Sequence, residues 1–426
     1  MSFNAERAFD LMKRIGFTRV AGTPEEFKAA NILMDEIRSI GLEPELESFT
    51  IPDAVNNKAT LEILEPYQAS YEVTAYKCCQ NTPEEGITAD FVYVQDCSDA
   101  CLLGVKGKIV LINGVMRLNL YRKLLELGVA GVITMSGSVF GRPEDDDLFT
   151  RKIRGTLSAF GLLTAANIRT RDAFDMIVKG ASRVRLTVSG ENCDITSHNV
   201  LVTIPGTEYP DEIVSFGAHY DSVAFSTGVY DNAAGSAVLM EVLRWYAEHP
   251  SKRTLRFNWY GAEELGLEGS KAFTRNHEDE LPRHRMMINL DVGGCVIGQD
   301  WARVCGDVSI VHACDAFMKM RGYTTSVGSG TQSSDGMPFA DKGVPVINFF
   351  RSGPETAAVM HDRRDVIDYL SADALAKTGI PVIDWCSQLT EAVVFPFERT
   401  MPADMVTTID NYFFKKELAE AENLKK

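Results

Sequence analysis

Residues 212–222 read EIVSFGAHYDS, an apolar run that leads into a histidine and an aspartate. Residues 212–216 have the composition of a buried strand, and His219 and Asp221 follow shortly after it. A helical pattern occupies 233–246, and a second apolar run over 255–260 ends in GAEELG. A strand, a helix and a strand in this order are typical of an α/β fold.

The same alternation continues toward the C-terminus. We predict strands over 286–290 and 344–350 and helices over 308–320 and 372–393. Upstream, 5–15 and 23–41 carry apolar residues at helical spacing. The second of these helices begins with Thr23 as a cap, Pro24 at its first position and Glu26 completing a capping box. Together these elements predict a sheet with helices on both of its faces.

Residues 61–190 have a different texture. The runs KIVLIN (108–113) and AGVITM (130–135) are short apolar strands on either side of a helical pattern at 118–127. Residues 184–189 again resemble a strand. The acidic run EDDD (144–147) is expected to be a solvated loop rather than a metal site. The segment therefore predicts a small separate unit without residues placed for chemistry.

The composition excludes several classes of function. The chain has 426 residues, and its 43 Lys and Arg against 59 Asp and Glu give a formal net charge of −16. So acidic a surface argues against binding to nucleic acid or to anionic lipid. We find no apolar signal region near the start and no run of 18 or more apolar residues, so neither a secretory signal nor a membrane span is expected. The nine cysteines form no CxxC ladder, which predicts reduced thiols and a cytoplasmic protein.

Residues that can bind metals follow the predicted strands of the C-terminal half. Read singly, each has an ordinary explanation, such as a helix cap or a solvated surface carboxylate. Together they occupy the carboxyl ends of strands, where open α/β sheets bind their ligands, and so many carboxylates would repel one another unless cations neutralised them. The residues in question are His219, Asp221, Asp231, Glu263, Glu264, Asp291 and His361.

The donor types indicate which metal such a cluster would hold. Imidazoles and carboxylates without a thiolate favour Zn²⁺, with Co²⁺ or Mn²⁺ as alternatives. Zinc normally takes four ligands, so this set is too large for one ion and suits two ions that share a carboxylate. Asp221 lies two residues from His219 in extended chain, where it can hold the imidazole by its other nitrogen.

At this point the motifs resemble those of a known family. The stretches GAHYDS (217–222), GVYDNAAGSAVLMEV (228–242), RTLRFNWYGAEELGLEGSKAF (253–273), INLDVGG (288–294) and the loop with His361 resemble the M28 family of co-catalytic di-zinc peptidases. The resemblance implies a phosphorylase/hydrolase-like mixed sheet flanked by helices, over 1–60 and 191–426. It also implies that 61–190 form a smaller, β-rich inserted domain like the protease-associated (PA) domain.

Carried over to this chain, the resemblance implies a role for each residue. His219 and Asp291 would bind one zinc, Glu264 and His361 the other, and Asp231 would bridge the two. Glu263 would be the general base, and Asp221 would orient His219. A cis peptide between Asp231 and Asn232 is also implied. The expected activity is an aminopeptidase that acts on short peptides, without nucleic acid or membrane as partners; the oligomeric state stays open, with a homodimer among the outcomes.

Two departures from the family pattern concern the substrate side. Relatives often carry a histidine where this chain has Gly336, in SDGMPF (334–339), and a tyrosine where it has Met360. Tyr230 and Arg363 are candidates to replace the tyrosine at the oxyanion.

Two alternatives to an aminopeptidase stay open. A glutamate carboxypeptidase-like or N-acyl amino acid hydrolase would need arginines for a substrate carboxylate, such as Arg351, Arg363 or Arg364. A glutaminyl cyclase-like acyltransferase would use a single zinc and lack the inserted domain.

Overall fold

The computed structural model describes residues 3–424, and contacts within it divide the chain into two units. The large unit comprises the chain up to Thr50 and Thr196–Phe413, and the inserted unit comprises Ile51–Ile195 and the segment that begins at Phe414. These boundaries fall inside two long strands, β1 (Glu45–Glu65) and β8 (Arg183–Ile204), whereas the sequence placed them at 60/61 and 190/191. Each unit is described by itself.

The large unit is built on a mixed sheet in the order β13-β12-β14-β11-β9-β10-β8. Its strands, besides β8, are β9 (Tyr209–His219), β10 (Arg253–Tyr260), β11 (His284–Leu290), β12 (Gln299–Cys305), β13 (Ser326–Ser329) and β14 (Val346–Ser352). The central strands β14, β11, β9 and β10 are parallel. β12 runs antiparallel to β14 and parallel to β13, and β8 runs antiparallel to β10. The expected α/β class and mixed sheet are confirmed.

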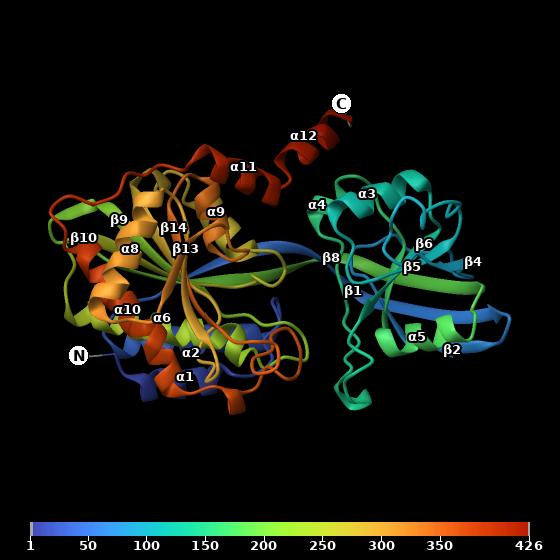
Figure 1. Cartoon of the computed structure of the whole chain (residues 1–426), viewed down its shortest axis with the longest axis horizontal. Helices are drawn as coiled ribbons and strands as arrows, with labels where there is room; N and C mark the ends of the chain where they lie inside the picture. The colour runs from blue at the N-terminus through green and yellow to red at the C-terminus, as the bar shows by residue number, and fades with distance from the viewer. Residues whose placement is uncertain (1–2, 425–426) are drawn as a thin grey trace. The chain divides into compact units, whose positions relative to one another are not determined.

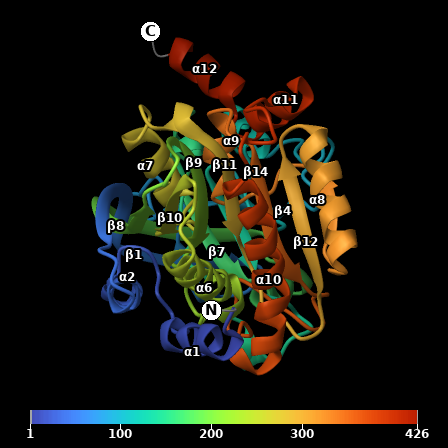
Figure 2. The same ribbon diagram turned by 90° about the vertical axis from the view of Figure 1, so that its left-hand side faces the viewer.

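Helices cover both faces of this sheet (Figure 1). The bounds are α1 (Ala5–Ile15), α2 (Pro24–Ser39), α6 (Ala234–Glu248), α7 (Glu268–Asn276), α8 (Val308–Arg321), α9 (Gly336–Asp341), α10 (Ala372–Thr390) and α11 (Ala403–Tyr412). Buried residues of α1, α2, α6, α8 and α10 form one core with the strands, and Figure 2 shows α6 and α10 side by side on that face. A second core on the opposite face joins α7, α9 and α11.

The start of α2 shows how local sequence fixes this packing. Thr23 accepts a hydrogen bond from the Glu26 N–H, as the sequence predicted. The Glu26 carboxylate reaches back to the N–H of Gly22 rather than to that of Thr23. Glu26 is also buried and accepts a hydrogen bond from Ser197, so it joins α2 to β8 as well as capping the helix.

The inserted unit has a sheet in the order β8-β4-β5-β6-β7-β3, with β1 and β2 paired beside it. Its elements are β2 (Ala69–Tyr71), β3 (Val73–Ala75), β4 (Ile87–Tyr93), β5 (Ile109–Ile112), α3 (Leu118–Leu127), β6 (Gly131–Ser136), α4 (Gly155–Ser158), β7 (Ala165–Arg169), α5 (Thr170–Val178) and α12 (Lys415–Leu424). One core lies under α5 and another under α3, so this unit has its own buried interior.

Two details of the fold bear on the sequence predictions. The acidic run at 144–147 is not fully solvated: Asp146 and Asp147 are buried, because the run folds against the end of β7, where Arg169 donates to the Asp146 carbonyl.

Within residues 3–424, no helix is both long and apolar enough to cross a membrane.

Candidate functional site

The candidate site lies at the carboxyl ends of the parallel strands of the large unit. His219 is the last residue of β9, and Asp291 directly follows β11, the strand on one side of β9. Glu263 and Glu264 follow β10, the strand on its other side. Because the chain leaves β9 toward β10 and then crosses to β11, β9 is the topological switch point at which such sheets bind ligands.

Two histidine-centred groups meet at this edge and share one carboxylate. His219 Nε2 is 3.1 Å from Asp231 Oδ1 and 3.3 Å from Asp291 Oδ1. His361 Nε2 is 2.9 Å from the other oxygen of Asp231 and 3.2 Å from Glu264 Oε2. The structure thus brings together all five residues expected to bind metal, with Asp231 between the two groups.

These separations fit two small cations. Zinc bonds to nitrogen and oxygen ligands are about 2.0–2.2 Å long, which places neighbouring donors of a tetrahedron about 3.3 Å apart. Each group also holds the donor types that zinc accepts, one imidazole and two carboxylates.

The electrostatics of the cluster favour positive charge between the carboxylates. The hydrogen bonds that His361 donates to Asp231 and Glu264 raise its pKa to about 11. Burial would lower the pKa of His219, but its carboxylate partners outweigh burial and raise it well above the usual range. Burial likewise works to raise the pKa of Asp231, and hydrogen bonds from both histidines lower it instead. A bound cation would neutralise the charge of the same carboxylates.

Asp221 holds two of the ligand-bearing segments in place. Its Oδ1 is 3.4 Å from His219 Nδ1, on the ring edge away from the cluster. Its two oxygens also accept hydrogen bonds from the N–H groups of Glu263 (3.0 Å) and Glu264 (3.2 Å). This second task was not foreseen from the sequence. Asp221 therefore fixes the turn after β10 relative to the end of β9.

The backbone around the site adopts rare conformations. The peptide between Asp231 and Asn232 is cis. Three residues of the site have positive φ values, between 56° and 63°. They are Ala262, which precedes Glu263, Val292, which follows Asp291, and the proposed ligand His361. A β-branched residue such as Val292 is disfavoured in this region, and strained backbone of this kind clusters at functional sites.

Glu263 and Asp335 are acidic groups beside the proposed ligands. Burial raises the pKa of Glu263 well above its usual range, and the charges of Glu264 and Asp335 add to this effect. Asp335 is fully buried, and burial raises its pKa to about 7. Both groups therefore hold a proton more readily than an exposed carboxylate does.

The two departures from the family pattern have different surroundings. At Gly336 a Cβ atom would lie 2.4 Å from Val346 Cγ1, so the space for a larger side chain is taken by β14. Met360 is 40% exposed beside His361. Tyr230, one candidate to replace the usual tyrosine, is buried and donates its hydroxyl to the Arg351 carbonyl (3.2 Å), which argues against that role.

The arginines proposed for a substrate carboxylate differ in their contacts. Arg351 is buried and bound to Asp300 at 2.6 Å, with further hydrogen bonds to the carbonyls of Cys295 and Val296. Arg364 is exposed and pairs with Asp362. Arg363 is also exposed. Arg351 is thus committed to a structural ion pair.

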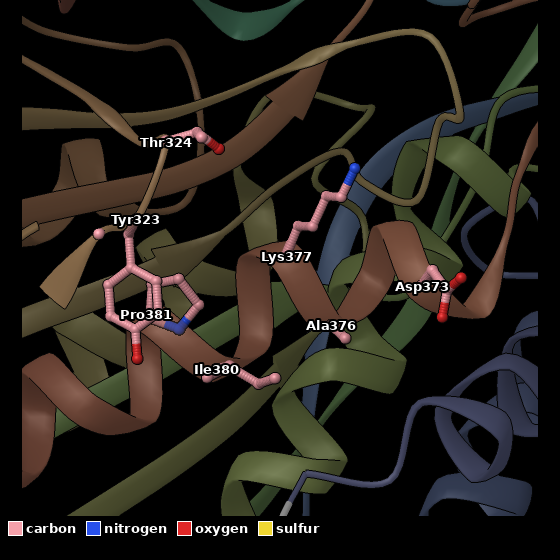
Figure 3. A pocket seen from close by; sticks show the side chains of 8 residues that line it. Tyr323, Thr324, Asp373, Ala376, Lys377, Ile380 and Pro381 are labelled. Atoms are coloured by element: carbon pink, nitrogen blue, oxygen red, sulfur yellow. The ribbon is translucent and has the colours of Figure 1, made fainter.

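A pocket of about 280 Å³ lies elsewhere on the large unit, at the end of α8 and along α10 (Figure 3). Figure 3 shows Tyr323 and Pro381 at one end and Asp373 at the other, with Lys377 between them. The described residues that line it include no histidine or cysteine, and the Tyr323 hydroxyl donates to Asp384. The pocket therefore offers no group of convergent catalytic side chains.

Two buried charges near the cluster were not singled out from the sequence. Arg19 donates to the backbone carbonyls of Tyr220, Thr227 and Gly228, and Asp365 accepts from the backbone of Tyr230 and Asp231. Their partners are backbone groups more than 100 residues away, and no sequence motif marks such contacts.

The chain is similar to known peptidases. The model of peptidase family M28 matches residues 199–385. Aminopeptidase YwaD of Bacillus subtilis is 28% identical over 407 residues, which cover 89% of this chain and 83% of that protein. Carboxypeptidase Q of Bos taurus is 24% identical over 86% of this chain and 85% of its own length.

A solved structure shows the same fold. BSAP, a zinc aminopeptidase from Bacillus subtilis, superimposes with a TM-score of 0.76 over 95% of this chain and 99% of its own, at 24% identity. The matched residues include all five of the clustered side chains, from His219 at the end of β9 to His361 in the loop after β14. Residues 199–385 are therefore similar to the domain that the model of peptidase family M28 describes.

Proposed function

We propose that the protein is an aminopeptidase that binds two zinc ions and releases N-terminal residues from short peptides. The observation that carries this proposal is the sharing of Asp231 between the groups centred on His219 and His361. The aminopeptidases among the relatives support it, and Co²⁺ or Mn²⁺ could replace zinc at the same donors.

The residues divide the work of peptide hydrolysis between them. When bound, two zinc ions lower the pKa of water and stabilise the charge that develops on the carbonyl oxygen. Glu263 takes a proton from the attacking water and passes it to the leaving amine. Asp221 keeps His219 and the Glu263–Glu264 turn in register through its three contacts.

The test compares free and N-acetylated peptides with and without a chelator. We expect amino acids to be released from free peptides and aminoacyl anilides, the activity to disappear with chelator and to return with zinc. Glu263→Gln should lower kcat about 10²–10⁴-fold, because it removes the general base, yet keep two zinc ions per chain by elemental analysis. Glu268→Gln, a half-buried carboxylate on α7, is the matched control. Release that survives complete metal removal would contradict the proposal.

A carboxypeptidase is the second candidate, because Carboxypeptidase Q is among the relatives. The commitment of Arg351 to Asp300 removes one of the arginines that could hold a substrate carboxylate. N-acetylation discriminates between the two: it stops an aminopeptidase and leaves a carboxypeptidase or N-acyl amino acid hydrolase active. A cyclase would bind one zinc per chain rather than two.

Three further properties remain proposals: the location, the class of the inserted unit and the oligomeric state. We place the protein in the cytoplasm, because all nine cysteines are free thiols and five of them are only half-buried. We assign the inserted unit to the PA-like class because of its separate β-rich core. Fractionation of cells would test the location. Gel filtration of the purified chain would show whether it forms a homodimer.

A further inference from the structure

The ligand-bearing segments of the site are unequally buried. The side chain of His219 is 1% exposed and those of Asp231 and Asp291 are 6% and 11% exposed. His361 is different, because its side chain is 55% exposed and its backbone has a φ of 63° in the loop after β14. The group that contains His361 therefore needs something to hold this loop against the rest of the site.

Asp365, four residues after His361, makes this connection. Its Oδ1 accepts the N–H of Tyr230 at 2.8 Å, and its Oδ2 accepts the N–H of Asp231 at 3.1 Å. Its backbone carbonyl accepts the Thr227 hydroxyl at 2.6 Å. Asp365 is 2% exposed. Hydrogen bonds from two backbone N–H groups to one buried carboxylate are strong, and they fix its position relative to that backbone.

Asp365 is also anchored within its own loop. Its N–H donates to the Asp362 carbonyl at 3.1 Å, so residues 362–365 form a closed turn directly after His361. A displacement of the Asp365 side chain would therefore move the turn that carries His361 relative to Asp231.

The other side of the 227–231 segment is held by Arg19. Its guanidinium donates to the carbonyls of Thr227 (2.6 Å), Gly228 (2.8 Å) and Tyr220, and its N–H donates to Ser222 Oγ at 3.0 Å. These contacts fix the backbone before Asp231 to the end of β9, where His219 lies. The group centred on His219 thus has a support that does not pass through Asp365.

We infer that Asp365 is a positioning residue that fixes His361 relative to the bridging carboxylate of Asp231. Zinc binding at Asp231, Glu264 and His361 then depends on Asp365 more than zinc binding at His219, Asp231 and Asp291 does. This inference rests on the proposed two-zinc site.

The experiment titrates the metal-free, full-length chain with Zn²⁺ against a chromophoric chelator. Wild type is expected to take up two ions. Asp365→Asn keeps the size of the side chain but turns an NH₂ group toward one of the two N–H donors. We therefore expect the ion in the His361 group, called the second ion, to bind about 10–100-fold more weakly. The ion in the His219 group, called the first ion, should bind within a few-fold of wild type. Asp368→Asn, an exposed carboxylate in the same segment, is the matched control and should bind both ions as wild type does.

Each other outcome has a distinct meaning. If Asp365→Asn binds both ions as tightly as wild type, or loses both equally, the inference is wrong. If wild type itself binds fewer than two ions, the proposed function fails instead.

A second variant guards against a loss of folding. Circular dichroism of the metal-free variants shows whether Asp365→Asn folds. If it does not, Thr227→Val decides, because it removes only the hydroxyl that binds the Asp365 carbonyl. We expect a smaller weakening of the same second ion, and an unchanged second ion would overturn the inference.

Discussion

Asp221, Asp365 and Arg19 bind the backbone of the site rather than its substrate-facing atoms. Asp221 accepts from two N–H groups after β10, Asp365 from two N–H groups before α6, and Arg19 donates to carbonyls on both sides of Asp221. A hydrogen bond between a charged side chain and the backbone is worth about 1.5–3 kcal/mol, more than one between neutral groups. These buried charges therefore hold the site in shape through contacts that do not involve a metal ion.

Glu26 is a buried acid whose ionisation should make stability depend on pH. Burial raises the pKa of Glu26 to about 8 from a usual value of about 4.5. As pH rises from about 4.5 to about 8, the unfolded chain loses this proton before the folded chain does, so the group's contribution to the free energy of unfolding is lost across this window. Glu26→Gln has no ionisable group at this position. Its stability relative to wild type, measured by urea titration, should therefore rise over the same pH range. Glu25→Gln, on the exposed side of α2, is the control. A wild-type-to-Glu26→Gln difference that is constant with pH would contradict the assignment.

At the scale of elements, apolar patterns found the four central parallel strands of the large unit but missed β12 and β13. The expected strands at 255–260 and 286–290 correspond to β10 and β11, and polar residues at their ends pointed to the site. In β12 a buried aspartate, Asp300, breaks the apolar pattern, and it is tolerated because Arg351 lies opposite it on β14. Such a pair is visible only once the two strands are known to be neighbours.

The same limit applies to the site. Residues that follow strands could be predicted because their chemistry and their place in the chain coincide. Asp365 could not, since its partners Tyr230 and Asp231 lie more than 130 residues away and are backbone groups. Sequence therefore indicates which side chains could bind metal, and the structure adds those that hold their segments in place.

The helix α9 offers a test of how tightly its first residue packs. Gly336→Ala would place a Cβ atom 2.4 Å from Val346 Cγ1, so we expect it to cost about 1–3 kcal/mol of stability by overpacking. Val346→Ala removes that atom, and the double variant should be more stable than the sum of the two single effects predicts. Urea unfolding of the four proteins measures this coupling. Additive effects would show that Gly336 is not constrained by β14.

At the scale of the whole molecule, the chain contains two units with separate cores, and the proposed metal ligands all belong to the large one. A ligand that binds only the folded form of one unit stabilises that unit alone. Metal binding should therefore separate the unfolding of the two units.

This separation can be measured because all four tryptophans, at positions 245, 259, 301 and 385, lie in the large unit. Their fluorescence reports the unfolding of that unit, while circular dichroism reports both. Zinc at about 100 times its Kd adds about 2.7 kcal/mol, which should raise the fluorescence-detected Tm by roughly 5–10 °C over the chelated protein. A second transition, seen by circular dichroism and not by fluorescence, should stay at the same temperature. In Asp231→Asn the shift of the first transition should shrink, because the shared ligand is lost. If zinc shifted the fluorescence and circular dichroism signals equally, the two units would unfold together. Metal binding would then stabilise the entire chain rather than the large unit, contrary to this prediction.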